Sequence, residues 1–202
     1  MHKNRLEAFS DGVIAIVITI MVLEMKVPHG DGWQHLLQLW PVFLSYVLSF
    51  LYVGVYWNNH HHLLQATHSI NGGTLWANLH LLFWLSLMPF TTGWMGENQF
   101  ARLPTMLYGA NLLACAIAYQ VLQTQLARHH GADNPMARAL GRNFKGKLSM
   151  LLYVAGILAA AVVTPMVGFS VFVGVLLLWL VPDRRMEHAM APPPQANTGG
   201  HS

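Results

Sequence analysis

The 202-residue chain is 54% hydrophobic and only 9% charged, with 11 Lys and Arg against 8 Asp and Glu. Soluble domains carry about 25% charged residues, so this composition excludes an ordinary soluble protein. With a mean hydropathy of +0.39, it indicates one all-α membrane domain whose helices are joined by short loops. The single Cys115 excludes an intramolecular disulfide.

The first predicted helix runs from Arg5 to Val27 and carries charge where a membrane helix rarely does. Its uncharged part, residues 12–23, spans only about 18 Å at ~1.5 Å per residue, against a hydrocarbon core about 30 Å thick. Glu7 and Asp11 must therefore enter the membrane, where a charged group is costly. We expect both carboxylates to face protein or water.

Helical spacing divides this helix into two faces. At about 100° per residue, one stripe is aliphatic and aromatic, and Glu7 and Asp11 lie close to the opposite side. Since the acidic side must face its own subunit, we expect the stripe to point away from that subunit, towards lipid or a symmetry mate. The stripe comprises Phe9, Ile16, Ile20, Leu23 and Val27.

Five further apolar segments follow in the sequence. The boundary between the last two depends only on Thr164-Pro165 and Gly168, a turn or a kink. The predicted segments are residues 6–27, 36–60, 73–95, 103–126, 148–163 and 165–181. Residues 1–182 are thus predicted to form a six-helix transmembrane subunit, and residues 183–202, which contain a Pro-Pro-Pro run, a disordered cytoplasmic tail.

Basic residues set the predicted orientation. If the N-terminus lies in the cytoplasm, nine Lys and Arg lie in the predicted cytoplasmic segments and two in the predicted external loops. This bias predicts that both termini are cytoplasmic. The inner group is Lys3, Arg5, Arg128, Arg138, Arg142, Lys145, Lys147, Arg184 and Arg185, and the outer group is Lys26 and Arg102.

Histidines are the main candidates for polar chemistry. Residues 60–62 end the second segment and His80 lies within the third. Metal or haem ligation is one interpretation, but adjacent histidines diverge around a helix and no spacing places two on one face with an acidic partner. For His80 we expect a buried pair with Asp11, because both lie at comparable depth.

The block from Arg5 to Gly12 reads Arg-Leu-Glu-Ala-Phe-Ser-Asp-Gly and fits R-x-x-x-F-S-D. This motif resembles the first-helix signature of the transmembrane protein 175 family of potassium channels. The resemblance extends over the whole chain for a prokaryotic member. It includes Tyr56-Trp57-Asn58 before the histidine cluster, and Asn78, His80, Pro89 and Phe90 in the third segment.

That resemblance implies a homotetramer in which four first helices line a central pore without a TVGYG loop. It places the constriction at Ile16, with Ile20 and Leu23 continuing the wall, and a hydroxyl layer linked to potassium preference at Thr19. Some members carry a second hydroxyl where this chain has Ala15. The residues expected to anchor the helix within the subunit are Arg5, Phe9, Ser10, Asp11, Trp57, Asn78 and His80.

The sequence therefore predicts a passive, potassium-permeable channel of the plasma (inner) membrane, with no catalytic residue, cofactor or metal site. No Gly-x-Ser-x-Gly, His-Glu-x-x-His or phosphate-binding glycine loop is present. Two alternatives remain open. One is a proton- or ion-coupled carrier using Asp11, His80 and Glu24, and the other is a haem- or metal-binding membrane protein using residues 60–62 and His80.

Overall fold

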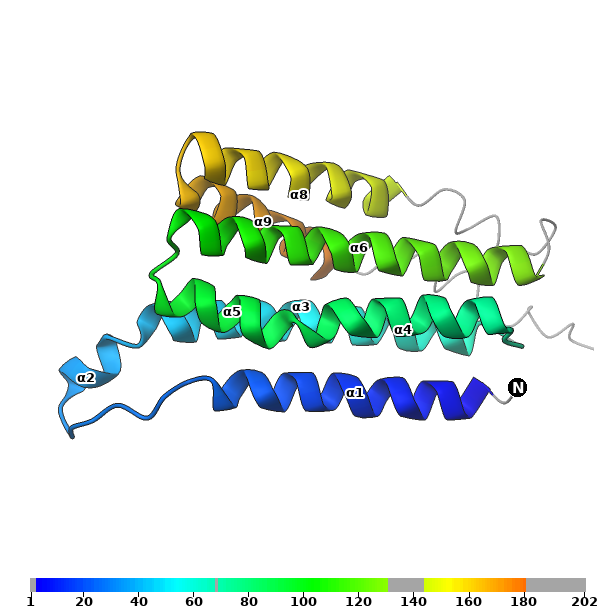
Figure 1. Ribbon diagram of the computed structural model, residues 1–202, viewed down its shortest axis with the longest axis horizontal. Coiled ribbons are helices and arrows are strands. Elements are labelled where there is room, and N and C mark those ends of the chain that lie inside the picture. The colour runs from blue at the N-terminus through cyan, green and yellow to red at the C-terminus, as the bar shows by residue number, and fades with distance from the viewer. Residues whose placement is uncertain (1–2, 68, 131–143, 181–202) are drawn as a thin grey trace, which may run out of the picture.

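The computed structural model describes residues 3–67, 69–130 and 144–180, with side chains as far as Arg128 in the second range, and all regular structure within them is α-helical. Labels follow Figure 1. The helices are α1 (Lys3–Leu23), α2 (Trp33–Leu37), α3 (Trp40–Gln65), α4 (Gly72–Ser86), α5 (Met88–Glu97), α6 (Arg102–His130), α8 (Phe144–Val162) and α9 (Pro165–Leu180).

The long helices run back and forth along one axis, and α1 lies at one edge of the bundle (Figure 1). It packs mainly on α3, α4 and α5, while α6, α8 and α9 pack together at the opposite edge. One whole side of α1 is therefore left without cover from the described part of its own chain.

The third predicted segment is not one helix. α4 ends at Ser86 and α5 begins at Met88, and the two lie end to end as one bent rod (Figure 1). Pro89 has no N–H to donate to the carbonyl four residues earlier, and the Leu87 N–H bonds Trp84 O at 3.2 Å, three residues back. The prediction of a continuous helix over residues 73–95 was wrong for this local reason.

The other boundaries are closer to prediction. Residues 36–39 do not join the second long helix, because a short α2 ends at Leu37 and α3 starts at Trp40, with Pro41 in its first turn. The break between the last two segments is confirmed: α8 ends at Val162, and the Thr164 side chain accepts the N–H of Val167 at 3.3 Å at the start of α9.

Within the described residues, four helices, α1, α3, α6 and α8, are long and apolar enough to cross a membrane, and α9 is a shorter apolar helix. The length and composition of these helices indicate an integral membrane protein.

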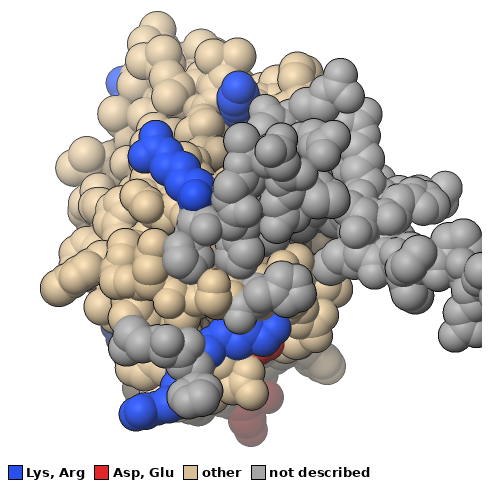
Figure 2. Space-filling model, turned by 90° about the vertical axis from the view of Figure 1, so that its right-hand side faces the viewer, with Lys and Arg blue, Asp and Glu red and all other residues tan. Residues whose placement is uncertain are grey.

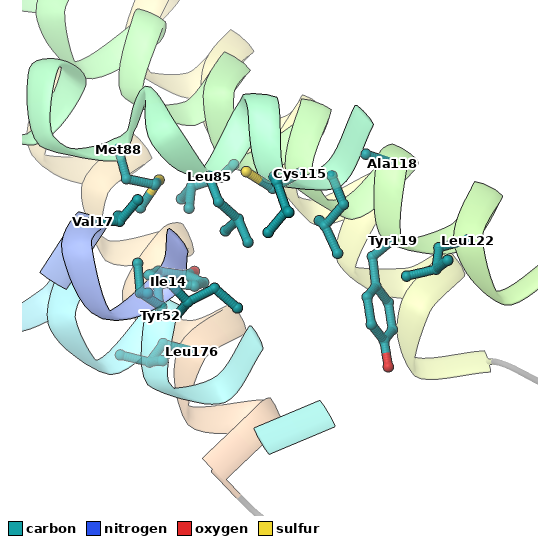
Figure 3. Close-up of a cluster of buried hydrophobic side chains, with 14 of the residues drawn as sticks. Ile14, Val17, Tyr52, Leu85, Met88, Cys115, Ala118, Tyr119, Leu122 and Leu176 are labelled. Atoms are coloured by element: carbon teal, nitrogen blue, oxygen red, sulfur yellow. The ribbon is translucent and has the colours of Figure 1, made fainter. Parts of the chain in front are cut away.

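A continuous apolar core joins these helices. Ile14 and Val17 of α1 point towards side chains of α3, α4 and α5, and the cluster continues along α6 (Figure 3). The residues labelled there are Ile14, Val17, Tyr52, Leu85, Met88, Cys115, Ala118, Tyr119, Leu122 and Leu176. This core fixes the register of α1 against its neighbours.

Basic side chains gather at the end of the bundle where the chain begins. Lys3 and Arg5 start α1, Arg128 lies near the end of α6, and Lys145 and Lys147 open α8. In the end view, Lys and Arg clearly outnumber Asp and Glu (Figure 2). The remaining predicted inner cations, Arg138, Arg142, Arg184 and Arg185, and the predicted tail 183–202 lie outside the described residues.

Candidate functional site: the two faces of α1

The inward face of α1 is a narrow buried stripe with spacings of three and four residues. Its members are Leu6, Ser10, Ile14, Val17 and Met21, none more than 6% exposed. This spacing follows the helical period, so a single side of α1 carries its contacts with the bundle.

The outward face carries the predicted aliphatic stripe. Phe9 is 52% exposed, Ile16 58%, Ile20 40% and Leu23 78%. These side chains point away from the subunit, as the spacing predicts. Val27 is also exposed, but α1 ends at Leu23, so Val27 lies beyond the helix. So continuous an apolar face requires a further surface, either lipid or protein, to cover it.

Thr19 lies on the same outward face, between Ile16 and Ile20. Its hydroxyl donates to Ile16 O at 2.9 Å, within its own helix. Because the hydroxyl hydrogen is used in this way, the oxygen presents its lone pairs outward. The exposed face of α1 thus has one polar acceptor among aliphatic side chains.

The two carboxylates of α1 face α3. Asp11 accepts a hydrogen bond from Trp57 Nε1 at 3.0 Å. Glu7 lies 3.0 Å from His61 Nδ1, and the His61 ring stacks on Trp57 with centroids 5.9 Å apart. The expectation that both carboxylates face protein is confirmed.

The expected pair between Asp11 and His80 is not formed. His80 is exposed on α4, and its Nε2 accepts from Trp84 Nε1 at 2.9 Å, one turn along the same helix. Similar depth was not enough to predict this pair, because the side of α4 that carries His80 faces away from α1. His80 therefore takes no part in holding α1.

The histidine that helps to hold α1 is His60, which is fully buried near the end of α3. Its Nε2 lies 2.7 Å from Asn78 Oδ1, and Asn78 Nδ2 donates to Ser10 Oγ at 2.9 Å. Ser10 Oγ in turn donates to Leu6 O at 2.8 Å. We call Ser10, Asn78 and His60 the buried triad; it links α1, α4 and α3.

His60 was not distinguished from its two neighbours by prediction, although the sequence carries a signal for it. It lies seven residues after Val53 and four before Leu64, both fully buried, so it continues the core stripe of α3. His61 and His62 leave that stripe and are partly exposed.

Two other predicted anchors behave differently. Arg5 is exposed and makes no hydrogen bond or ion pair with another described residue, and Phe9 belongs to the outward stripe. At the start of the helix it is Lys3 that contacts α3: its Nζ lies 3.4 Å from Leu64 O and 3.3 Å from Gln65 O. A cation at a helix C-terminus complements the exposed carbonyls there.

A cavity of about 530 Å³ opens between the C-terminal half of α1 and α5. It adjoins the outward stripe, and both Ile16 and Ile20 contribute to its wall. The lining residues are Val13, Ile16, Val17, Ile20, Glu24, Ser86, Pro89, Phe90, Gly93, Trp94 and Glu97. The N-terminal half of α1 is thus closely held by polar contacts, whereas its C-terminal half borders open space.

Across the described ranges, no three His, Cys, Asp or Glu side chains come together as a metal site would require. Of the three histidines of α3, His60 belongs to the buried triad, His61 pairs with Glu7, and the His62 ring lies against that of His61 with centroids 5.8 Å apart.

Comparisons with known proteins agree on one family. A family model described as endosomal/lysosomal potassium channel TMEM175 matches residues 5–89, from α1 to the start of α5. A potassium channel of Chryseobacterium sp. is 50% identical over 190 residues, covering 94% of this chain and 98% of its own. A potassium channel of Streptomyces collinus is 34% identical over 68% of this chain and 73% of its own.

Among solved structures, a lysosomal potassium-selective channel TMEM175 homolog from Chamaesiphon minutus superposes with a TM-score of 0.77 at 27% identity. The match covers 94% of this chain and 98% of that one. Near-complete coverage in both directions, at 50% identity in the Chryseobacterium relative, places the chain in the TMEM175 family.

Proposed function

We propose that this chain is a potassium-permeable cation channel that conducts passively through a central pore lined by α1. The relatives that it matches over nearly their whole length are named potassium channels. The observation that carries the pore assignment is the outward face of α1, which is apolar, continuous and uncovered within the subunit.

A homotetramer accounts for that face. Four copies arranged around a shared axis would bring Ile16, Ile20 and Leu23 of each subunit towards the centre, and closed symmetry would cover the face without a second protein. Lipid could also cover an aliphatic stripe, but contact with lipid gives the hydroxyl of Thr19 no role. In a pore, this hydroxyl can accept a contact from a permeating cation.

The chemistry of the stripe suggests how conduction is controlled. An isoleucine ring has no polar atom to replace hydration water, so a dry constriction at Ile16 is a barrier, while a wider and wetted one passes a partly hydrated ion. The Thr19 oxygens lie three residues further out and would offer four acceptors to that ion. Ala15 adds none, so we expect only moderate discrimination of potassium from sodium.

We further propose six membrane crossings, with α4 and α5 together forming the third. Both termini then lie on the side where Lys and Arg gather, which the positive-inside rule identifies as the cytoplasm. On this proposal residues 1–182 form the channel subunit, and the membrane is the inner membrane of a prokaryotic cell.

The test is potassium flux and reversal potential in liposomes, with matched polar substitutions. Ile16→Asn should raise potassium conductance by wetting the constriction. Leu177→Asn is the control: Leu177 on α9 is an aliphatic residue with the same 58% exposure, at the far edge of the bundle. Equal conductance in the two variants would contradict the assignment of α1 as the pore helix, and concentrative uptake would identify a carrier instead.

A further inference from the structure

The charged side chains at the outer end of α1 are not all paired. Lys26 Nζ lies 2.7 Å from Glu97 Oε1, at the end of α5. This hydrogen bond, together with the charge of Glu97, raises the pKa of Lys26 above its usual range, so Lys26 is fully protonated at neutral pH. Each member of this exposed pair offsets the charge of the other.

Glu24 has no such partner among the described residues. It is exposed, and no hydrogen bond or ion pair joins its carboxylate to another described side chain. Its side chain lies over Gly93 of α5, where an added Cβ would come within 3.8 Å of Glu24 Cβ and Oε2. These are ordinary van der Waals distances, so the Glu24 side chain lies directly beside α5.

Glu24 is also continuous with the proposed pore wall. Its N–H bonds Ile20 O at 3.2 Å, so the helical turn extends past Leu23 to include it. It lines the same cavity as Ile16 and Ile20. The Glu24 carboxylate, which makes no hydrogen bond or ion pair with another described side chain, thus lies at the outer end of the aliphatic stripe.

We infer that Glu24, repeated around the tetramer, forms a ring of negative charge that concentrates cations at the outer mouth of the pore. This inference depends on the proposed function, since it needs α1 at the pore. Glu24, Lys26 and Glu97 together carry a net charge of minus one per subunit, hence minus four per tetramer. A single exposed carboxylate is not a coordination site, so the ring acts through its field rather than by binding an ion.

A field effect has a distinctive dependence on salt. The Debye length is about 30 Å at 0.01 M and about 3 Å at 1 M, so a ring at the mouth raises the local cation concentration in dilute salt and is screened in concentrated salt. Because the ring lies at one mouth only, it should favour current that enters from that side.

The experiment compares wild type, Glu24→Gln and Lys26→Gln as single channels in planar bilayers, in about 0.01 M and 1 M KCl. Glu24→Gln should lower conductance from the outer side about two- to fivefold in dilute salt, should abolish the preference for current that enters from that side, and should leave conductance in 1 M KCl nearly unchanged. Lys26→Gln, which removes the positive charge, should raise conductance in dilute salt. Size-exclusion profiles identical to wild type establish that both variants assemble.

Two results would overturn the inference: a dilute-salt conductance in Glu24→Gln equal to wild type, or a loss equally large in 1 M KCl, which would indicate a structural role. The Ile16→Asn measurement distinguishes a failure of the Glu24 inference from a failure of the pore assignment. If Ile16→Asn raises conductance while Glu24→Gln has no effect, the inference fails and the pore assignment stands. If neither has an effect, the pore assignment itself fails.

Discussion

Replacing Asn78 by Leu tests whether the buried triad anchors α1. Asn78 is fully buried and bonds in both directions, to Ser10 Oγ at 2.9 Å and to His60 Nε2 at 2.7 Å. Leucine has nearly the same shape but bonds neither. Ser10 keeps its bond to Leu6 O, whereas His60 loses the one hydrogen bond that its ring makes, because Nδ1 has no partner among the described residues.

The expected cost follows from these two bonds. Stranding a buried polar group costs about 1–3 kcal/mol in soluble proteins. Hydrogen bonds within membrane domains average nearer 0.6 kcal/mol, with a maximum of about 1.7, because the unfolded chain in the bilayer also finds partners. For two bonds we expect Asn78→Leu to lower the free energy of unfolding by about 1–3 kcal/mol, most of it through His60.

The assay is unfolding of the purified protein in micelles, followed by circular dichroism over a denaturant titration. Asn98→Leu is the control, because Asn98 is exposed at the end of α5 and bonds only Trp94 O in its own helix turn. It should change stability by less than about 0.5 kcal/mol. A double-mutant cycle of Asn78→Leu with His60→Leu should give a coupling energy of about 0.5–1.7 kcal/mol. Strict additivity, or an Asn78→Leu variant as stable as wild type, would refute the anchoring role.

Three further predictions concern selectivity, anchoring and packing. Thr19→Val removes the outward hydroxyl at constant shape and should lower the potassium-to-sodium permeability ratio. Thr19→Ser keeps the hydroxyl and should keep the permeability ratio of wild type. Unchanged reversal potentials in Thr19→Val would contradict a role of the Thr19 hydroxyl in selectivity. Asp11→Ala should reduce the yield of assembled protein on size exclusion more than it reduces conductance per channel, because it removes the acceptor of Trp57. Because Trp57 is 44% exposed, this loss of yield should be smaller than the loss of yield in Asn78→Leu. A larger loss of yield in Asp11→Ala would contradict the prediction that the buried triad is the stronger anchor. Gly168→Ala should destabilise the protein by about 1–3 kcal/mol, because the added Cβ would meet the backbone of α8. Gly174→Ala in the same helix is the control and should be neutral, because its Cβ meets nothing within 4 Å. Equal melting temperatures for these two variants would show that α8 and α9 pack more loosely than described.

The faces of α1 were predictable because they depend only on helical period. Once Glu7 and Asp11 are required to face protein, the direction of Ile16 and Ile20 follows from 100° per residue. The partners of the carboxylates were not predictable, because they depend on the rotation of α3 and α4 about their own axes. His61 was therefore missed as the group that meets Glu7, and Trp57, although expected among the anchoring residues, was not predicted as the partner of Asp11.

The same limit explains the choice between His60 and His80. Both lie in apolar segments; the spacing of His60 from Val53 and Leu64 was a signal, but which stripe of α3 is buried is fixed by the packed structure, where His60 continues that stripe and His80 is exposed. The break at Leu87 is a different case. Pro89 was visible in the sequence, but a proline within an apolar run permits either a bend in one helix or a restart, and its position alone does not distinguish the two.

The contacts of α1 are distributed unevenly along its length, and this bears on how a pore built from it would open. Lys3, Glu7, Ser10 and Asp11 all bond groups on α3 or α4, whereas the buried residues beyond them, Ile14, Val17 and Met21, make only apolar contacts. Apolar contacts are not directional, so they permit sliding and tilting that hydrogen bonds resist. The cavity beside Ile16 and Ile20 adds space on the α5 side, and the Lys26–Glu97 pair beyond it is exposed and therefore weak. An opening motion would then pivot near Asp11 and displace Leu23 and Ile20 further than Ile16, so the inner ring at Ile16 would remain the narrowest point and control the current.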